Sequence, residues 1–386
     1  MSRIRLALIG LSASAKTSWA SEGHLPYLLS PRGLSKYEIS ALLNSTTSSA
    51  EAARAHYNLP ASVKAYGSPD DLANDPDIDL VVCCTRVDVH LSTVLPSLQN
   101  GKAAYIEWPL ASNLADANIL AAAAKSTRTV AGLQVRLSPP LRAVQALLTQ
   151  GTIGKVLSSD VRAFTSILRA SELPEGLAYF ADRKVGGSPI TIAFGHMIDF
   201  VHHVLGEFTT ASASWRLQIQ RPTVAITGSG GKTIHSDVPD YVAVHGEVTG
   251  KPYVAAGASL ALTMRNGAAF PGDPGFVWTI NGEKGELKIT SPAGPYWQLD
   301  GGEKITIHVH DYATNAVREE MWKWEAWQEE LQFCARSVGD MYEQFAAGAE
   351  NSDAVPDFAD AVVRHRELQG MLDSWDAQLA GEEKTR

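Results

Sequence analysis

The chain has 386 residues, of which 45% are hydrophobic and 19% are charged, so it exceeds what one hydrophobic core usually holds and predicts two domains. Its net charge of -9, without clustered Lys and Arg, argues against nucleic-acid binding. The sequence contains no apolar run of about twenty residues, so no membrane span is predicted. The three cysteines form neither a disulfide framework nor a metal-ligand spacing, which is typical of a cytoplasmic protein.

The N-terminal stretch predicts a buried strand, a tight turn and the start of a helix. Apolar residues between Arg5 and Ile9 run into Gly10, small residues follow, and a helical pattern begins near Ser21. Unpaired N–H groups and the helix dipole at such a start favour the pyrophosphate of a dinucleotide. Of the usual G-x-G-x-x-G pattern only Gly10 is present, while Ser12 and Ala15 hold the other two places. Residues this small still allow the backbone to approach a phosphate.

The same stretch has two other interpretations. One is an ordinary strand and turn that binds no ligand. The other is a secretory signal, because Arg3 and Arg5 precede an apolar run and residues 13–15 resemble a cleavage site. The apolar core from Leu6 to Leu11 is shorter than the roughly seven to fifteen residues of such signals, so we set this interpretation aside.

The first third of the chain alternates strands and helices. Further buried strands are predicted at 38–44, 78–85, 103–107 and 129–134, and helices at 48–56 and 113–126. This α/β alternation predicts a parallel sheet with right-handed crossovers. Functional groups are then expected at the carboxyl ends of the strands.

The end of the second strand bears on which nucleotide binds. An Asp or Glu there would hold the ribose 2′-OH of NAD, but the sequence has the hydroxyl-rich segment 44–49, with Arg54 nearby. Hydroxyls and a guanidinium suit a 2′-phosphate, so Ser45, Thr46 and Arg54 favour NADP(H) over NAD. A Ser/Thr-rich helix cap is an equally good interpretation of any one of these residues.

A series of short motifs resembles one known protein family. The motifs lie, in chain order, at residues 85–90, 107–109, 132–136 with Pro139, 151–154, 186–187 and 195–199. Their order and spacing resemble the Gfo/Idh/MocA family of glucose-fructose oxidoreductases and inositol dehydrogenases across nearly the whole chain. Within it, the nearest likeness is to the fungal galactose-regulon repressor branch, through Gly10, Trp19, His24, Pro26, the pair Glu107–Trp108 and residues 194–199.

The resemblance implies a Rossmann domain over 1–135 and a substrate and dimerisation domain over 136–386, with nicotinamide and substrate at their junction. The second domain would be α+β, an open and mostly antiparallel sheet flanked by helices. The sequence agrees, because strand-like runs lie at 158–166, 211–218, 241–248, 253–264, 276–280, 285–290 and 304–310, with a hairpin at 280–286 and a closing helix at 356–379. One sheet face stays open and family members commonly pair through it, so a homodimer is expected.

The catalytic positions depart from the family pattern. The resemblance implies Glu-Lys-Pro after the fourth strand, and Trp108 stands in place of the Lys. It also implies an Asp and a His four residues apart on one helix, and here His196 is present while Ile192 replaces the Asp. His196 can exchange a proton alone, oriented by Asp199 or Tyr179. It also lies within an apolar helix stripe, so a structural histidine is an equally weighted interpretation.

Trp108 and Glu107 each have two interpretations. Trp108 either shapes an apolar pocket against the nicotinamide or is a core aromatic residue. Glu107 either bonds to the nicotinamide ribose or is a charge at a strand end. The resemblance also implies cofactor contacts in the matched motifs and at the N-terminal helix start, which here hold Thr85, Arg86, His90, Gln134 and Trp19.

Substrate and metal contacts are the last candidates. Arg136, Lys184 and Asp199 are candidate substrate contacts, although most cations such as Arg136 and Lys184 are simply solvated. His202 and His203, together with His196 and Asp199, do not have a known zinc spacing, and two of them are expected to point outward. No metal site is therefore predicted.

Two functions of different classes follow. The first is an NADP(H)-dependent oxidoreductase that transfers hydride to or from a small carbonyl, alcohol or imine, either a sugar or a fungal metabolite. The second is a non-catalytic regulatory protein that senses NADP, which the missing Lys and Asp support. We favour the enzyme, because family members are mostly catalytic and an aldehyde or imine needs less activation of a hydroxyl.

Overall fold

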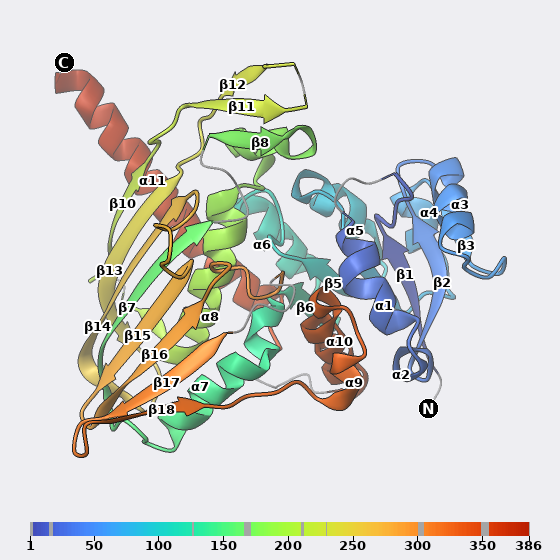
Figure 1. Ribbon diagram of the computed structural model, residues 1–386. Coiled ribbons are helices and arrows are strands. Elements are labelled where there is room, and N and C mark those ends of the chain that lie inside the picture. Colours follow the sequence, from blue (N-terminus) through green and yellow to red (C-terminus); the bar gives the residue numbers. More distant parts are fainter. Residues whose placement is uncertain are drawn as a thin grey trace. The chain divides into compact units, whose positions relative to one another are not determined.

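The computed structural model describes residues 3–14, 18–125, 127–165, 171–209, 212–228, 230–299, 305–348 and 355–385. It groups the chain into two compact units (Figure 1). The first unit comprises residues 1–137, 184–187 and 325–366, and the second comprises residues 138–183, 188–324 and 367–386.

A six-stranded parallel sheet forms the centre of the first unit. Its strands are β1 (Ile4–Ile9), β2 (Tyr37–Leu43), β3 (Lys64–Tyr66), β4 (Leu80–Cys83), β5 (Ala103–Glu107) and β6 (Thr129–Gly132). They lie in the order β3-β2-β1-β4-β5-β6, and every neighbouring pair is parallel. The expected parallel sheet is therefore confirmed. The sequence missed β3 because its three residues are too few for a periodic pattern.

The first unit also contains helical segments. They are η1 (Ala20–His24), α1 (Leu25–Leu28), α2 (Pro31–Leu34), α3 (Thr47–His56), α4 (Pro69–Ala73), η2 (Val87–Val89), α5 (His90–Gln99), α6 (Leu114–Ala123), η3 (Gln134–Leu137), α9 (Ala326–Glu329) and α10 (Phe333–Ala346). α11 (Phe358–Thr385) contributes its first part to this unit and the remainder to the second. The helices expected at 48–56 and 113–126 are α3 and α6.

α10 belongs to the first unit although it lies near the end of the chain. Its apolar residues Val338, Met341 and Tyr342 are fully buried and pack in one core cluster with Leu6 and Leu8 of β1. A division at residue 135 puts α10 in the other domain, whereas in the structure residues 325–366 lie with the first unit. Helical spacing shows that a helix has an apolar face, but it does not show which core that face completes.

The second unit contains a nine-stranded sheet. Its strands are β7 (Val156–Thr165), β9 (Glu207–Phe208), β10 (Ser214–Gln218), β13 (Tyr241–Thr249), β14 (Val254–Asn266), β15 (Phe276–Gly282), β16 (Gly285–Ser291), β17 (Thr306–Asp311) and β18 (Ala316–Glu320). The order is β10-β13-β14-β7-β15-β16-β17-β18, with β9 beside β13. β7 runs parallel to β14, and the other pairs are antiparallel. This confirms the expected mostly antiparallel sheet.

One face of this sheet is covered by helices α7 (Pro139–Thr149) and α8 (Gly195–Leu205) (Figure 1). The π-helical turn η6 (Pro189–Phe194) leads directly into α8. Every residue of α8 is buried, including His202 and His203. The expectation that two of its polar residues point outward is therefore wrong, because a helix packed on several sides leaves none of its faces in water.

A small three-stranded sheet in the second unit was not foreseen. It consists of β8 (Glu172–Pro174), β11 (Thr223–Thr227) and β12 (Thr233–His235) and is joined to the 3₁₀ turns η4 (Glu175–Ala181) and η5 (Arg183–Val185). Leu173, Ala181, Val224 and Ile226 form its separate core.

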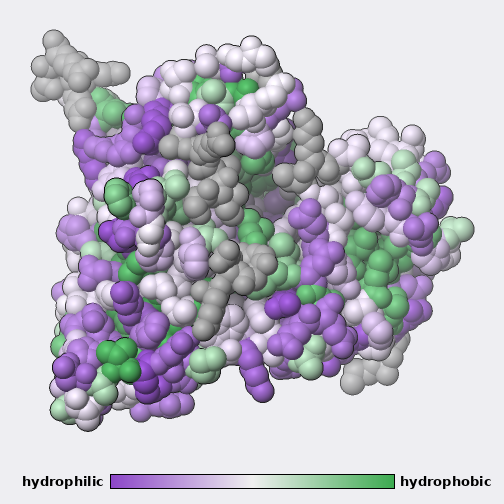
Figure 2. All heavy atoms as spheres, in the orientation of Figure 1, coloured by the Kyte–Doolittle hydropathy of each residue, from purple (hydrophilic) through white to green (hydrophobic). Residues whose placement is uncertain are grey.

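On the face in view, hydrophobic residues of the second unit appear in small groups among hydrophilic ones (Figure 2). Among the described residues, no helix combines the length and hydropathy that a bilayer span requires.

Candidate functional site

The turn after β1 lies at the point where the sheet order reverses, between β1 and β4. Gly10 has a φ of +91°, and a Cβ placed there would lie 2.9 Å from Thr85 Cγ2 and 3.1 Å from the carbonyl carbon of Cys84. Only glycine fits both this backbone conformation and this close approach. In open α/β sheets a ligand binds at such a reversal, so this turn is where a dinucleotide is expected.

Polar groups with unused hydrogen-bonding capacity lie around this turn. The buried Ser18 Oγ and Trp19 Nε1, where the chain enters η1, find no hydrogen-bond partner among the described residues. Ser12 Oγ accepts from Ser14 N at 3.3 Å, so it shapes the turn itself. Ala15 lies outside the described residues. Buried polar atoms are normally satisfied, so Ser18 and Trp19 fit the presence of a polar ligand here.

The end of β2 carries exposed hydroxyls and no acidic side chain. Ser45 and Thr46 are exposed, and Thr46 caps α3 by accepting a hydrogen bond from Ser49 N at 3.1 Å. The helix-cap interpretation of Thr46 is thus realised, and its hydroxyl remains at the helix N-terminus. Arg54 Nη1 donates to the Val63 carbonyl at 2.7 Å. The Arg54 guanidinium therefore already supports the Val63 loop.

The loop after β4 contains three of the predicted cofactor contacts. His90 is buried, with Nε2 3.0 Å from the Thr85 carbonyl oxygen and Nδ1 3.1 Å from that of Pro109. The imidazole therefore connects the loops that follow β4 and β5, and burial lowers its pKa. Arg86 is exposed and makes a bidentate ion pair with Asp88, which lowers the pKa of that carboxyl. Thr85 remains half-buried beside Gly10.

Glu107, at the end of β5, belongs to a buried hydrogen-bonded chain. His24 Nε2 lies 2.9 Å from Glu107 Oε1, and His24 Nδ1 lies 2.8 Å from the Tyr342 hydroxyl. A carboxylate only accepts, so His24 donates to Glu107 from Nε2, and its Nδ1 accepts from Tyr342. A Cβ at Gly132 would lie 2.4 Å from Glu107 Oε2. Glu107 therefore anchors α10 and η1 to the sheet, a role that strand-end spacing did not reveal.

Trp108 follows Glu107 and is 5% exposed. Its ring centroid lies 4.8 Å from that of His365 on α11. His365 is also 5% exposed, its Nε2 accepts a hydrogen bond from Ala111 N at 3.4 Å, and burial lowers its pKa to about 4. The family lysine position is therefore an apolar wall backed by an uncharged imidazole. From the sequence, His365 was only one residue of the closing helix predicted at 356–379.

The remaining candidates of the first unit lie near the ends of β5 and β6. Gln134 is 1% exposed, and its Oε1 has no hydrogen-bond partner among the described residues. Arg136 is buried, and its Nη1 lies 3.4 Å from Asp360 Oδ1. Lys184 is exposed in the segment 184–187, where a Cβ at Gly186 would lie 2.4 Å from Ser112 Cα. Glycine at 186 therefore brings this segment against the loop after β5.

His196, Asp199 and Tyr179 lie in the second unit. His196 and Asp199 are buried on α8, 5% and 1% exposed, and three residues apart they share one side of the helix. Tyr179 is half-buried in η4, its ring packed edge-to-face on Phe180 at 4.9 Å. Three side chains that could hold a metal ion lie together elsewhere in the second unit, namely His202 on α8, Glu207 on β9 and Glu367 on α11.

The first unit thus has the topology and the turn of a dinucleotide-binding Rossmann protein. Residues 4–135 match the oxidoreductase family with an NAD-binding Rossmann fold, and residues 139–291 match the Gal80p C-terminal domain. The dehydrogenase aclE of Aspergillus oryzae is 32% identical over 295 residues, which cover 75% of this chain and 78% of that protein. The galactose/lactose metabolism regulatory protein GAL80 of Saccharomyces cerevisiae is 22% identical over 413 residues, covering 96% of this chain and 92% of that protein.

Solved structures of the same fold include enzymes and regulators. A super-repressor mutant of Gal80p from Saccharomyces cerevisiae superimposes with a TM-score of 0.83 at 20% identity, covering 98% of this chain and 97% of that one. Levoglucosan dehydrogenase in complex with NADH and L-sorbose gives a TM-score of 0.75 at 16% identity, covering 98% of both chains. The chain belongs to the Gfo/Idh/MocA oxidoreductase family, near its Gal80 branch.

Proposed function

We propose that this protein is an NADP(H)-dependent oxidoreductase acting on a small carbonyl, alcohol or imine. The observation that carries the proposal is the turn at Gly10, where the backbone approaches Thr85 too closely for any side chain. In the segment that follows, Ser18 Oγ and Trp19 Nε1 are buried and have no hydrogen-bond partner among the described residues. The 32% identity to a dehydrogenase over most of the chain supports a catalytic role over mere nucleotide binding.

NADP is favoured over NAD by the end of β2. Ser45 and Thr46 are exposed at the start of α3, and the first turn of this helix contains no acidic residue. Hydroxyls and a helix N-terminus suit a 2′-phosphate, whereas a carboxylate would repel it. Arg54 contributes less than its sequence position suggests, because it lies about 10 Å along the helix from Thr47 and bonds to Val63.

The chain's own residues supply positioning and proton exchange. A bound nicotinamide supplies the hydride chemistry, and Trp108 with His365 would exclude water on one side of it. His196 is the residue that we expect to exchange the proton, because it alone remains of the family's Asp and His pair. A substrate such as an aldehyde or imine needs little activation by a lysine, which fits tryptophan at position 108.

A second candidate function is an NADP-sensing regulatory protein. Its support is the match to GAL80 over 96% of this chain, together with the absence of the family lysine at Trp108 and of the family Asp at Ile192. In that case the nucleotide would bind without turnover, and His196 would serve only to pack α8.

Measuring NADPH oxidation in the presence of a panel of sugars, keto compounds and imines distinguishes the two functions. We expect turnover of at least one class by the wild type, and a loss of 10²-fold or more in His196→Ala, since general acid–base groups contribute on this scale. The matched control is His245→Ala, an exposed histidine on β13, which should retain activity. Tight NADPH binding without turnover on any class would support the regulator instead.

We also propose a homodimer through the open face of the nine-stranded sheet. Glu286, Lys288 and Thr290 alternate with buried residues along β16, so they face away from α7 and α8 and line a groove of about 800 Å³. Val317 on β18 also lines this groove and is 64% exposed. Analytical sedimentation of the wild type should give twice the monomer mass. The double substitution Lys288→Glu and Val317→Glu should lower this mass towards that of the monomer. A monomeric wild type at micromolar concentration would contradict the proposal.

A further inference from the structure

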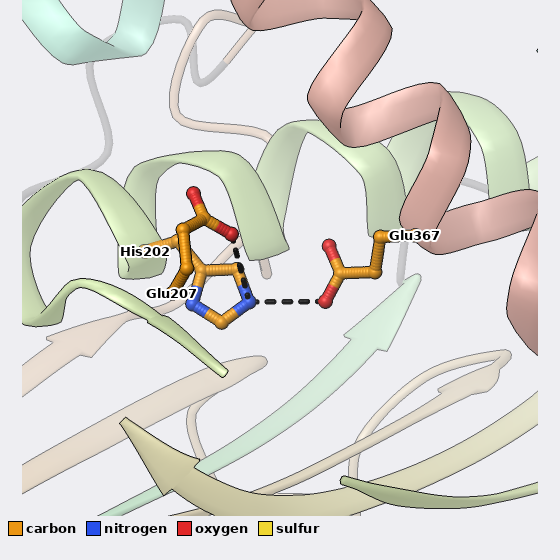
Figure 3. A group of neighbouring side chains, drawn as sticks. All are labelled: His202, Glu207 and Glu367. Carbon is orange, nitrogen blue, oxygen red and sulfur yellow. Dashed lines mark hydrogen bonds and ion pairs between the residues drawn. The ribbon is translucent and has the colours of Figure 1, made fainter. Parts of the chain in front are cut away.

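Three potential metal ligands meet at the end of α8 in the second unit. His202 lies in the last turn of α8, Glu207 is the first residue of β9, and Glu367 lies on α11 (Figure 3). His202 Nε2 is 3.0 Å from Glu367 Oε1 and 3.9 Å from Glu207 Oε2, and the three ligand atoms lie within 4.8 Å of one another. Among the described residues, no other group of three or more His, Cys, Asp or Glu meets this geometry.

The orientation of His202 is fixed by the turn that ends α8. The imidazole is fully buried, and its Nδ1 lies 2.7 Å from the Gly206 carbonyl oxygen. A carbonyl oxygen only accepts, so Nδ1 carries a proton and Nε2 is the nitrogen that faces the two carboxylates. Metal-binding histidines are oriented in the same way by a hydrogen bond from their other nitrogen.

Gly206 makes this arrangement possible. Its φ is +87°, and a Cβ there would lie 1.9 Å from the Thr249 carbonyl oxygen, so only glycine fits. The turn reverses the chain after α8, which brings Glu207 back to His202. The edge of the imidazole packs against Phe208 with ring centroids 4.7 Å apart, which further limits its rotation.

A positive charge is needed at Nε2. A neutral imidazole would point the lone pair of Nε2 at carboxylate oxygens, which is repulsive. A second proton on Nε2 would bond to Glu367 and form an ion pair with Glu207, and a metal cation at Nε2 would attract the same two carboxylates. Ligands about 2.1 Å from a tetrahedral Zn²⁺ are separated by about 3.4 Å, which lies between the two observed separations.

We propose that His202, Glu207 and Glu367 bind one divalent transition-metal ion, with water completing its coordination. One imidazole and two carboxylates suit Zn²⁺ or Co²⁺, whereas Mg²⁺ and Ca²⁺ prefer oxygen ligands alone. Glu367 is 165 residues from His202 in sequence, so the ion joins α11 to the turn between α8 and β9. Its role is structural, because it joins elements that are far apart in the sequence.

The test is a calorimetric titration of the metal-free full-length protein with Zn²⁺, alongside thermal unfolding. We expect one Zn²⁺ per chain and a rise in Tm of about 5 °C at saturating Zn²⁺. Mg²⁺ at the same concentration should give neither. Co²⁺ should give visible absorption bands of a low-coordinate site with nitrogen and oxygen ligands.

Variants decide whether the ion occupies this site. Glu207→Gln should lower Zn²⁺ affinity at least tenfold, because it replaces a charged carboxylate ligand by a neutral amide. His202→Asn keeps an N–H near the Gly206 carbonyl and removes Nε2, so it should abolish binding. Should His202→Asn fail to fold, Glu367→Gln tests the same ligand set.

The matched control is Glu330→Gln, an exposed carboxylate directly after α9 in the first unit. It should bind Zn²⁺ as the wild type does. Two results would overturn the proposal. One is a wild type that binds no stoichiometric Zn²⁺, leaving an imidazolium ion pair. The other is equal binding by Glu207→Gln and the wild type, which would mean adventitious binding at other histidines.

Discussion

The indole of Trp108 packs on the imidazole of His365, with ring centroids 4.8 Å apart and planes inclined by 48°. Trp108 is the first residue after β5, at the position where family members place a lysine, and His365 comes from α11, more than two hundred residues later in the chain. Both side chains are buried, so the pair presents an uncharged wall where the family pattern has a cation.

We predict that His365 makes the protein less stable in mild acid. Burial, and secondarily the nearby His90, lowers its pKa to about 4, below the usual value of 6.5 in the unfolded chain. As the pH falls below 6.5, the unfolded state takes up the proton first. The free energy of unfolding therefore decreases between pH 6.5 and about pH 4, and above pH 6.5 this loss is absent. Between pH 7.5 and 5, His365→Gln should lose about 2 kcal/mol less unfolding free energy than the wild type. Urea denaturation at the two pH values measures this, and equal losses in both proteins would contradict it.

The buried chain of Glu107, His24 and Tyr342 should contribute to stability. Tyr342→Phe removes the hydroxyl that donates to His24 Nδ1 and leaves that nitrogen buried without its donor, which should cost about 1 to 3 kcal/mol. The matched control is Tyr312→Phe, whose exposed hydroxyl bonds to Asn281 and should cost less than about 0.5 kcal/mol. Chemical denaturation provides both values. Similar small losses in the two variants would show that the chain is not stabilising.

Gly10→Ala should impair nucleotide binding as well as stability. An alanine at φ +91° is strained by about 1 to 2 kcal/mol, and its Cβ would push the Thr85 loop away. Gly101→Ala is the matched control, because φ is +78° there and no atom lies within 4 Å of the added Cβ. We expect at least tenfold weaker NADPH binding for Gly10→Ala in a fluorescence titration, and wild-type affinity for Gly101→Ala. Unchanged affinity in Gly10→Ala would place the nucleotide elsewhere.

Ser45→Asp should shift nucleotide preference. A carboxylate at the end of β2 repels a 2′-phosphate and can accept hydrogen bonds from a ribose, so NADPH affinity should fall about tenfold or more while NADH affinity is kept or improved. Ser35→Asp, also exposed, is the control and should leave both affinities unchanged. A wild type that binds NADH more tightly than NADPH would contradict the proposed specificity.

Much of the fold could be predicted because its signals are local. The run into Gly10, the alternation along residues 276–291 and the helical stripe of α8 each follow from backbone geometry within one element. The small sheet of β8, β11 and β12 gave no such signal, since its strands are short and flanked by residues of mixed character. For Ser45 and Thr46 the local pattern also left two interpretations open, and only the cap made by Thr46 could be observed.

The chemistry that the chain can offer is visible in its residues alone: a glycine turn after β1, no acid after β2, and tryptophan in place of lysine after β5. The folded chain was needed to see that α10 completes the core of the first unit, that His24 joins Glu107 to Tyr342, and that His202 meets Glu367. Periodicity is local, because it is fixed within a few residues. Contacts across hundreds of residues depend instead on how apolar faces and buried polar groups fit together once the chain has collapsed.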